Sequence, residues 1–158
     1  MTPFTQHRGV ALPLLRDNID TDAIIPSREM RTVSRSGLAA GLFAPWRYLD
    51  PDVRTPNPEF ALNQSEYNGA SILLAGDNFG CGSSREHAVW ALMESGFRAV
   101  IAPSFAAIFR NNALRNGLLT VALAQHDLDE LVAWVSADPV ANAIQLDLKA
   151  CTIEFDPE

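Results

Sequence analysis

Short apolar runs separated by polar turns characterise the second half of the chain. Residues 71–76 (SILLAG) and 98–102 (RAVIA) are mostly apolar without alternation, which is typical of strands buried on both faces of a parallel sheet. Between them, residues 86–95 carry a helical pattern that ends at Gly96, a residue type common just after helices. A strand, a helix and a second strand within about 30 residues predict a βαβ unit with parallel strands.

The preceding and following segments extend this pattern. Apolar residues alternate at 10–14, and Pro13 predicts that this strand is short or lies at an edge. Residues 38–49 look loosely helical, whereas 50–63 contain three prolines and predict a surface loop. After Pro103, the stripe that predicts the next helix consists of Phe105, Ile108, Phe109 and Asn112.

Three further elements complete the expected fold. Residues 118–123 (LLTVAL) predict a third strand, and residues 128–135 predict an amphipathic helix. Alternation at 144–148 and again at 151–155 predicts an antiparallel hairpin, although Lys149-Ala150 is a poor turn pair. We therefore expect one α/β domain over residues 1–158, with antiparallel strands at its end.

The composition fits a globular domain and argues against two classes of function. Of the 158 residues, 47% are hydrophobic and 20% are charged, and the formal net charge is -7. An acidic chain does not attract nucleic acid, and a membrane span would need about 18 consecutive apolar residues, which the sequence lacks. The two cysteines, Cys81 and Cys151, form no disulfide framework or metal motif, which favours a reducing, cytoplasmic location.

One segment, residues 76–92 (GDNFGCGSSREHAVWAL), is denser in glycine and polar residues than core packing requires. Ser83 precedes Glu86 by three residues, the spacing of a capping box, so a helix is expected to begin at Ser83. Backbone N–H groups at a helix start attract anions, and the two neighbouring glycines let a ligand approach the backbone. The guanidinium of Arg85 suits a carboxylate or a phosphate. The segment follows a parallel strand, where ligands of α/β proteins bind.

Spacing excludes the better-known glycine-rich sites. Arg85 stands where a dinucleotide fingerprint needs its third glycine, and the Gly-Lys-Ser/Thr of a phosphate loop is absent. A nucleophile turn needs a second glycine after its serine, and Cys81 with His87 underfills a metal site. Ser83 and Glu86 also fit the plainer role of capping a helix, but that role leaves Arg85 beside paired glycines and serines unexplained.

Two polar residues on the predicted helices have alternative roles. The helix dipole disfavours a charged His87 in the first turn, so we favour a hydrogen-bonded packing role for it. Asn112 lies on an apolar stripe and is either a buried, satisfied amide or a residue that faces the site. The sequence leaves these two interpretations of Asn112 open.

A second polar cluster follows the strand predicted at residues 10–14. Residues 17–26 (DNIDTDAIIP) place Asp17, Asp20 and Asp22 in a short loop. Such runs most often form turns and caps, and a calcium loop would need more oxygen ligands and a glycine at the bend. The functional alternative is that one aspartate meets Arg85 and fixes its guanidinium.

Three segments, NFGCGSSREHAVWAL, AVIAPSFAAIFRNNALRNGLL and DNIDTDAIIP, together resemble the small subunits of 3-isopropylmalate dehydratase, which are similar to the swivelling domain of aconitase. The resemblance covers residues 10–121. It implies a three-layer β/β/α domain with a largely parallel central sheet, and a large-subunit partner that carries a [4Fe–4S] cluster. It also implies that this chain holds no cofactor. The reaction implied is the isomerisation of 2-isopropylmalate to 3-isopropylmalate by dehydration and rehydration, in leucine biosynthesis.

Carried over residue by residue, the resemblance implies roles for both polar clusters. Ser83 would be the base that removes the carbon-bound proton. The pKa of a serine hydroxyl is too high for this unaided, so Arg85 and the helix start would stabilise its anionic form. Arg85 would also bind a substrate carboxylate, Ser84 would add a hydrogen bond, and Asp22 would orient Arg85. Cys81 is not expected to bind the cluster.

Two departures from the family limit this expectation. The segment expected to read the substrate contains Arg28, Glu29, Met30 and Arg31, where an isopropyl group would favour an apolar wall. A related 2-hydroxy diacid, citramalate or a methylated malate, is therefore the alternative substrate, and a non-catalytic carboxylate-binding module is the alternative function. The chain also ends several dozen residues before relatives usually do, so a C-terminal segment is expected to be missing.

Overall fold

A four-stranded parallel sheet lies at the centre of the computed structural model, which describes residues 4–30, 37–50 and 52–155. The strands stand in chain order, β2-β3-β4-β5, and every neighbouring pair is parallel. They span Ala11–Leu14 (β2), Ile72–Ala75 (β3), Ala99–Ala102 (β4) and Leu119–Ala122 (β5). The strands predicted at 10–14, 71–76, 98–102 and 118–123 are thus confirmed, and β2, with Pro13, lies at an edge as expected.

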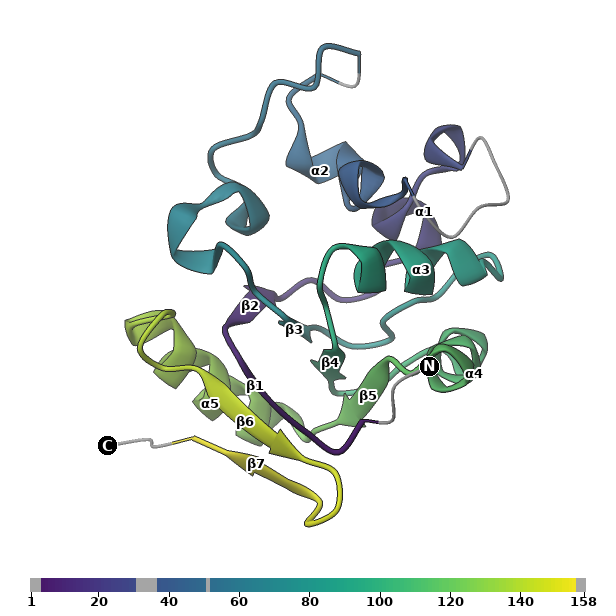
Figure 1. Cartoon of the computed structure of the whole chain (residues 1–158). Helices are drawn as coiled ribbons and strands as arrows, with labels where there is room; N and C mark the ends of the chain where they lie inside the picture. The colour runs from purple at the N-terminus through teal and green to yellow at the C-terminus, as the bar shows by residue number, and fades with distance from the viewer. Residues whose placement is uncertain (1–3, 31–36, 51, 156–158) are drawn as a thin grey trace.

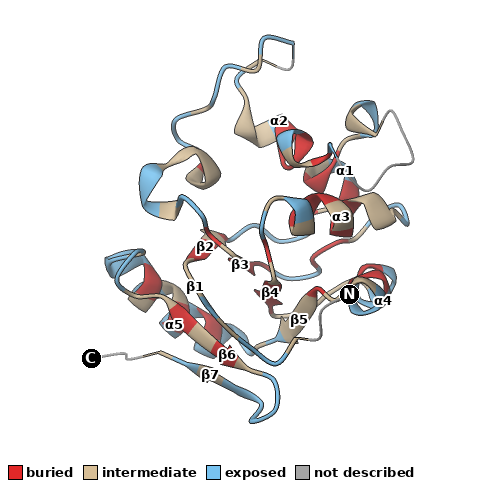
Figure 2. Cartoon of the chain, in the orientation of Figure 1, coloured by how far each residue is buried: buried red, intermediate tan, exposed pale blue. Residues whose placement is uncertain are grey.

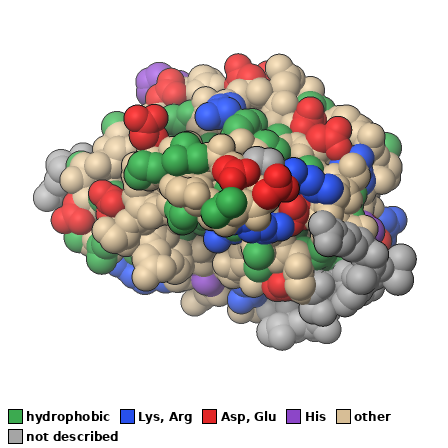
Figure 3. All heavy atoms as spheres, turned by 90° about the horizontal axis from the view of Figure 1, so that it is seen from above, with side chains coloured by type: hydrophobic (Ala, Val, Ile, Leu, Met, Phe, Trp, Pro, Cys, Tyr) green, Lys and Arg blue, Asp and Glu red, His purple; other side chains and the backbone are tan. Residues whose placement is uncertain are grey.

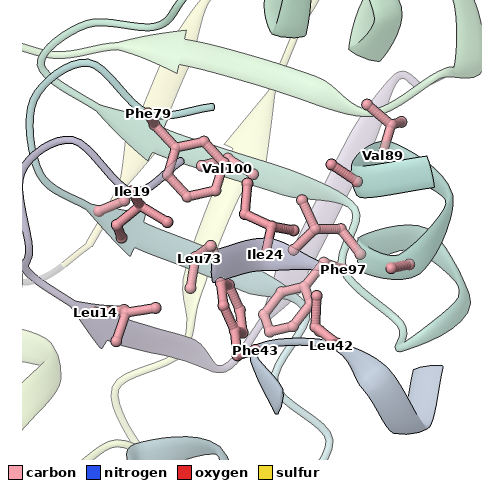
Figure 4. Packing of buried hydrophobic residues seen from close by; sticks show 14 of the residues in the cluster. Leu14, Ile19, Ile24, Leu42, Phe43, Leu73, Phe79, Val89, Phe97 and Val100 are labelled. Atoms are coloured by element: carbon pink, nitrogen blue, oxygen red, sulfur yellow. The ribbon is translucent and has the colours of Figure 1, made fainter. Parts of the chain in front are cut away.

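Strands β3 and β4 are buried along their whole length because both faces of the sheet are covered. Alternate side chains enter two separate cores. Leu73 and Val100 point to the first, with Phe79, Val89 and Phe97 around them (Figure 4). Ile72 and Ile101 belong to the second. Each buried aliphatic or aromatic side chain contributes about 1.5–3 kcal/mol relative to leaving it exposed.

Helices cover one face of this sheet and a mixed layer covers the other (Figure 1). Helices α1, α2 and α3 lie on the first face, and α4 lies beside β5. Helix α5 and a second sheet form the other layer, where Leu128, Leu131 and Val135 of α5 are buried (Figure 2). The helices span Thr21–Ile24 (α1), Ala44–Arg47 (α2), Glu86–Glu94 (α3), Ala107–Asn116 (α4) and Gln125–Ala137 (α5), and four 3₁₀ turns span Ser27–Glu29, Ala39–Gly41, Ala61–Asn63 and Ser65–Tyr67.

The second sheet contains three antiparallel strands in the order β1-β6-β7. Strands β6 (Ile144–Asp147) and β7 (Thr152–Glu154) form the expected hairpin. Strand β1 (Gln6–Gly9), which the sequence pattern did not reveal, pairs with β6. The two sheets and the helices give the expected three layers, with α5 sharing the layer of the second sheet.

Two expected helical segments differ in detail. Residues 38–49 form only a 3₁₀ turn and the one-turn helix α2, because Phe43 between them has a left-handed backbone with φ of 55°. On α4 the buried residues are Phe109, Asn112 and Ala113, whereas Ile108 is 53% exposed, so the predicted stripe is wrong at that position. No helix in the described part of the chain has the length and apolar character to cross a membrane.

Candidate active site

The loops after β2, β3 and β4 are joined by backbone hydrogen bonds at the carboxyl edge of the parallel sheet. Gly80 N donates to Ile19 O at 2.8 Å, and Thr21 N donates to Cys81 O at 2.9 Å. Ala106 N donates to Phe79 O at 3.0 Å. The two polar clusters of the sequence are therefore side by side, as their positions after neighbouring parallel strands predict.

Gly80 allows the loop after β3 to approach the Phe109 side chain of α4 closely. Its φ is +83°, and a Cβ there would lie 2.3 Å from Phe109 Cγ. A side chain at this position would thus meet both backbone strain and a ring that is almost fully buried. Gly80 therefore serves the packing of the loop on α4.

The three aspartates of the second polar cluster have separate roles. Asp17 accepts a hydrogen bond from Asp77 N at 2.8 Å, and Asp20 caps α1 by accepting from Ala23 N at 2.8 Å. Asp22 pairs with the guanidinium of Arg85. Two aspartates therefore fix turns, as such runs most often do, and the third meets the arginine, which is the contact that the functional alternative requires.

The helix start differs from the expected capping box. Helix α3 begins at Glu86 with Arg85 in the N-cap position, and no side chain caps it. Glu86 instead accepts a hydrogen bond from Asn116 Nδ2 of α4 at 2.8 Å. The prediction that the helix begins at Ser83 is therefore wrong, because a tertiary contact takes the side chain that a capping box would use. Since helix-terminus effects fall off within one turn, any stabilisation of Ser83 by the dipole is weaker than the sequence suggested.

Ser83 and Arg85 line one cavity of about 230 Å³. The other lining residues come from α1, from the glycine loop and from the start of α4, namely Thr21, Gly80, Gly82, Ala106, Ala107, Ile108, Phe109 and Asn112. Thr21, which the sequence analysis passed over, is buried and donates from Oγ1 to Ser83 O at 2.9 Å. Small-molecule sites usually have at least ~300 Å³, so this cavity is small for a complete ligand site.

The cavity has a polar and an apolar side. Arg85, with 21% of its side chain exposed, also donates to Ile25 O at 3.4 Å, whereas Ser83 is exposed. Ala107 and Ile108 form the apolar side. Ser84 is exposed next to Ser83 but does not line the cavity. A cavity of about 860 Å³ between α5 and the β6–β7 hairpin is larger, but it contains none of these residues.

The segment expected to read the substrate is turned toward other contacts. Glu29 has a side chain only 10% exposed and pairs with Arg54, with Arg28 Nε 3.6 Å from its second oxygen. Met30 packs against the first core. Arg31 lies outside the described residues. None of Arg28, Glu29 and Met30 lines the cavity of Ser83 and Arg85.

His87 and Asn112 also received a clear placement. The His87 ring packs on Trp90 with centroids 4.8 Å apart, so the packing role is confirmed. Its Nε2 is buried without a hydrogen-bond partner among the described residues, so the expected hydrogen bond is not found at that atom. Asn112 is 5% exposed, is hydrogen-bonded and lines the cavity, so both interpretations left open apply to it.

Metal ligands are sparse in the described part of the chain. His126, Asp127 and Glu130 lie close enough to share an ion, but all three are exposed on α5 and such groups are common without a metal. Both cysteines are free.

On the face that carries α1, α2 and α3, seen from above in Figure 3, acidic and basic side chains are interspersed, and the described residues form no patch of one sign there.

Comparisons with known proteins agree with the aconitase-like fold. The sequence matches the family model "Aconitase C-terminal domain" over residues 1–126. The chain is 64% identical over 149 residues to the 3-isopropylmalate dehydratase small subunit of Cupriavidus necator, covering 94% of this chain and 72% of the relative. It is 54% identical over 153 residues to the protein of the same name from Shewanella baltica strain OS185, covering 97% of this chain and 76% of the relative.

A solved structure gives the same result. The crystal structure of 3-isopropylmalate dehydratase from Methanocaldococcus jannaschii matches with a TM-score of 0.66 and 31% identity, over 96% of this chain and 83% of that one. The fold and these comparisons thus define an aconitase-like domain of the hydro-lyase class. The chain belongs to the aconitase C-terminal domain family and, within it, to the small subunits of 3-isopropylmalate dehydratase.

Proposed function

We propose that this chain supplies the proton-removing and carboxylate-binding half of a 3-isopropylmalate dehydratase active site, which a large subunit completes. One observation carries the proposal: Ser83 and Arg85 line the same cavity, and Asp22 holds Arg85 there. The small volume of the cavity supports the view that the chain forms only part of the site. The relatives named 3-isopropylmalate dehydratase small subunit support the choice of reaction.

In this proposal Ser83 is the base. The hydrogen bond from Thr21 Oγ1 to the Ser83 carbonyl oxygen fixes the backbone that carries this side chain on the cavity wall. The proton passes from the substrate carbon to Ser83 Oγ, and the same group returns it in the rehydration step. The positive guanidinium on the same cavity favours the anionic form of the serine.

Arg85 holds a substrate carboxylate. Its planar guanidinium offers paired N–H donors, and Asp22 and Ile25 O occupy only one of its terminal nitrogens, Nη1. Asp22 therefore orients the guanidinium and leaves donors for the ligand. Ser84 is proposed to add a hydrogen bond from the exposed rim, beside the cavity.

The substrate proposed is 2-isopropylmalate. Glu29 does not offer the apolar wall that an isopropyl group favours. Its side chain pairs with Arg54 and does not line the cavity, so it does not oppose this substrate. Ala107 and Ile108 offer apolar surface there, which favours an alkyl group at about 25 cal/mol per Å² buried. Citramalate and a methylated malate remain the comparison substrates for the assay.

The cluster is proposed to reside on the large subunit. Iron–sulfur clusters are held by several cysteine thiolates, and this chain has two cysteines, of which Cys151 lies at the β6–β7 turn. Only Cys81 is near the site. The cluster, when bound by the partner, supplies Lewis-acid chemistry at the leaving hydroxyl. The cytoplasmic location expected from the cysteine pattern stays a prediction.

Reconstitution with a 3-isopropylmalate dehydratase large subunit tests the proposal. The wild-type pair should isomerise 2-isopropylmalate, and Ser83→Ala should lower kcat by about 10³-fold while the pair still assembles on size-exclusion chromatography. Ser65→Ala is the matched control, because Ser65 is exposed in a 3₁₀ turn outside the cavity, and it should keep wild-type turnover. Unchanged turnover in Ser83→Ala would remove Ser83 from the role of base.

A further inference from the structure

Asn112 is a buried polar side chain in a cavity whose chemistry is otherwise accounted for. It lies on α4, is 5% exposed, and lines the same cavity as Ser83 and Arg85. Burying an amide without hydrogen-bond partners lowers the stability of the fold, because each unpaired polar group loses its hydrogen bonds to water. The position of Asn112 therefore calls for a partner for each end of its amide.

The orientation of the amide is fixed by Arg115, one turn further along α4. A guanidinium nitrogen of Arg115 donates to the Asn112 side chain. Arginine offers donors and no acceptor, so the atom that faces it is Oδ1. The Nδ2 group, with its two N–H donors, is left on the other side of the amide.

No described residue accepts a hydrogen bond from Asn112 Nδ2. The neighbouring contact, from Asn116 Nδ2 at 2.8 Å, goes to the Asn112 backbone carbonyl and does not use the side chain. The free donors thus belong to a residue that is almost wholly buried except where it lines the cavity. A ligand oxygen in the cavity would satisfy them.

We propose that Asn112 is a substrate-binding residue, whose Nδ2 donates to an oxygen of the substrate carboxylate that Arg85 binds. The inference rests on the proposed function, since it places the substrate in the same cavity. Arg115 is a positioning residue: it holds Oδ1 and so keeps the N–H groups directed away from itself. Asn112 donates from α4 and Arg85 from the segment before α3, so the carboxylate is held from two elements.

The test uses the complex with the large subunit and 2-isopropylmalate. Asn112→Leu keeps the approximate size of the side chain and removes the donor, so kcat/KM should fall about 10- to 100-fold, mainly through KM. The control is Asn111→Leu, because Asn111 is the exposed neighbour on α4 and does not line this cavity. A kcat/KM within twofold of wild type for a folded, assembled Asn112→Leu complex overturns the inference.

Two measurements separate the inference from its alternatives. The side-chain amide resonance of Asn112 in the wild-type complex should shift on addition of 2-isopropylmalate, and an unmoved resonance contradicts the contact even if turnover fails. Arg115→Ala should lower kcat/KM less than Asn112→Leu does, and it should add no loss in the double variant, because Arg115 acts through Asn112. Additive losses would contradict the positioning role.

Discussion

Arg85 shows how single residues define this site. Its guanidinium contacts the Asp22 carboxylate and the Ile25 carbonyl, both in or next to α1, although Arg85 itself precedes α3. The Asp22 side chain is 65% exposed, so the pair contributes little to stability, typically below about 1 kcal/mol. Its importance is therefore expected in orientation, and so in catalysis.

We predict that Asp22→Asn will leave the free energy of unfolding within about 0.5 kcal/mol of wild type while raising KM for 2-isopropylmalate by about 10-fold. The amide keeps the shape but loses the charge that directs the guanidinium. Chemical denaturation and steady-state kinetics of the reconstituted complex measure the two effects. A large fall in stability with unchanged KM would assign Asp22 to the fold alone.

Replacing the guanidinium itself should be more severe. Arg85→Lys keeps the charge but loses the planar pair of donors, so kcat/KM should fall by about 100-fold or more. Arg110→Lys on the exposed face of α4 is the matched control, because Arg110 does not line the cavity. Equal activity of the two lysine variants would show that charge alone is sufficient.

At the scale of elements, the carboxyl edge of the parallel sheet depends on local backbone geometry that side chains would disturb. Gly80 combines a left-handed φ with contact against Phe109, whereas Gly69 has a similar φ of +76° with open space around it. The two positions therefore separate backbone strain from steric overlap.

We predict that Gly69→Ala will lower the free energy of unfolding by about 1 kcal/mol, the cost of a left-handed alanine. Gly80→Ala should lose about 1–3 kcal/mol more, because the added methyl overlaps Phe109. Urea unfolding of both variants measures the difference. Equal losses would mean that the Phe109 ring moves aside without cost.

Glu94 joins two elements by an unusual contact. Its Oε1 accepts hydrogen bonds from three consecutive backbone N–H groups, those of Gly37 at 3.0 Å and of Leu38 and Ala39 at 3.1 Å each. The end of α3 thereby holds the 3₁₀ turn that begins at Ala39. The carboxylate takes the place of a capping side chain within that turn.

Glu94→Ala is expected to cost about 1–2 kcal/mol of stability, since three N–H groups lose their acceptor. Glu94→Gln keeps an acceptor oxygen and should cost less. Denaturant unfolding of both variants provides the measurement. A glutamine variant as unstable as the alanine variant would show that the charge, and not the acceptor, is needed.

At the scale of the whole molecule, the elements whose hydrophobic pattern lies in consecutive residues could be predicted from the sequence. Elements that depend on pairing with a distant segment could not. Strands β3 and β4 are indicated by their apolar runs and helix α5 by its helical period, because the pattern of each element lies within a few consecutive residues. Strand β1 pairs with β6 from Gln6 to Asp147, and nothing near Gln6 indicates that partner. The helix start at Glu86 was also missed, because Asn116 of another helix decides what Glu86 does.

The same distinction holds for the site. Parallel topology predicts that one aspartate of residues 17–22 meets Arg85, and the family resemblance is what indicated Asp22 among the three. The separation of Glu29 from the cavity depends on Arg54, and the orientation of Asn112 depends on Arg115. The sequence alone does not show which of several arginines makes each contact.

A histidine links the two sheets and makes stability depend on pH. His7 of β1 lies with Nε2 2.7 Å from Ser71 Oγ, and burial, followed by the charge of Arg98, lowers the pKa of His7 from 6.5. The folded state thus favours the neutral ring. Its contribution to stability is complete above pH 6.5 and is lost as the pH falls through the unfolded and then the folded pKa.

We predict that the difference in stability between wild type and His7→Gln will shrink or reverse as the pH is lowered from 7.5 to about 5. Urea unfolding of both proteins across this range gives the comparison, and the other titrating groups cancel in it. A difference that does not change with pH would show that His7 does not titrate in this range.

The hydrogen bonds that join the three loops at the carboxyl edge have a consequence for assembly. Gly80 N to Ile19 O, Thr21 N to Cys81 O and Ala106 N to Phe79 O are all made within this chain. Association with a partner therefore does not need to order these loops, and the conformational entropy that opposes many binding reactions is already lost on folding. These loops are therefore preorganised, and ordering them adds little to the cost of binding a substrate or a partner at this edge.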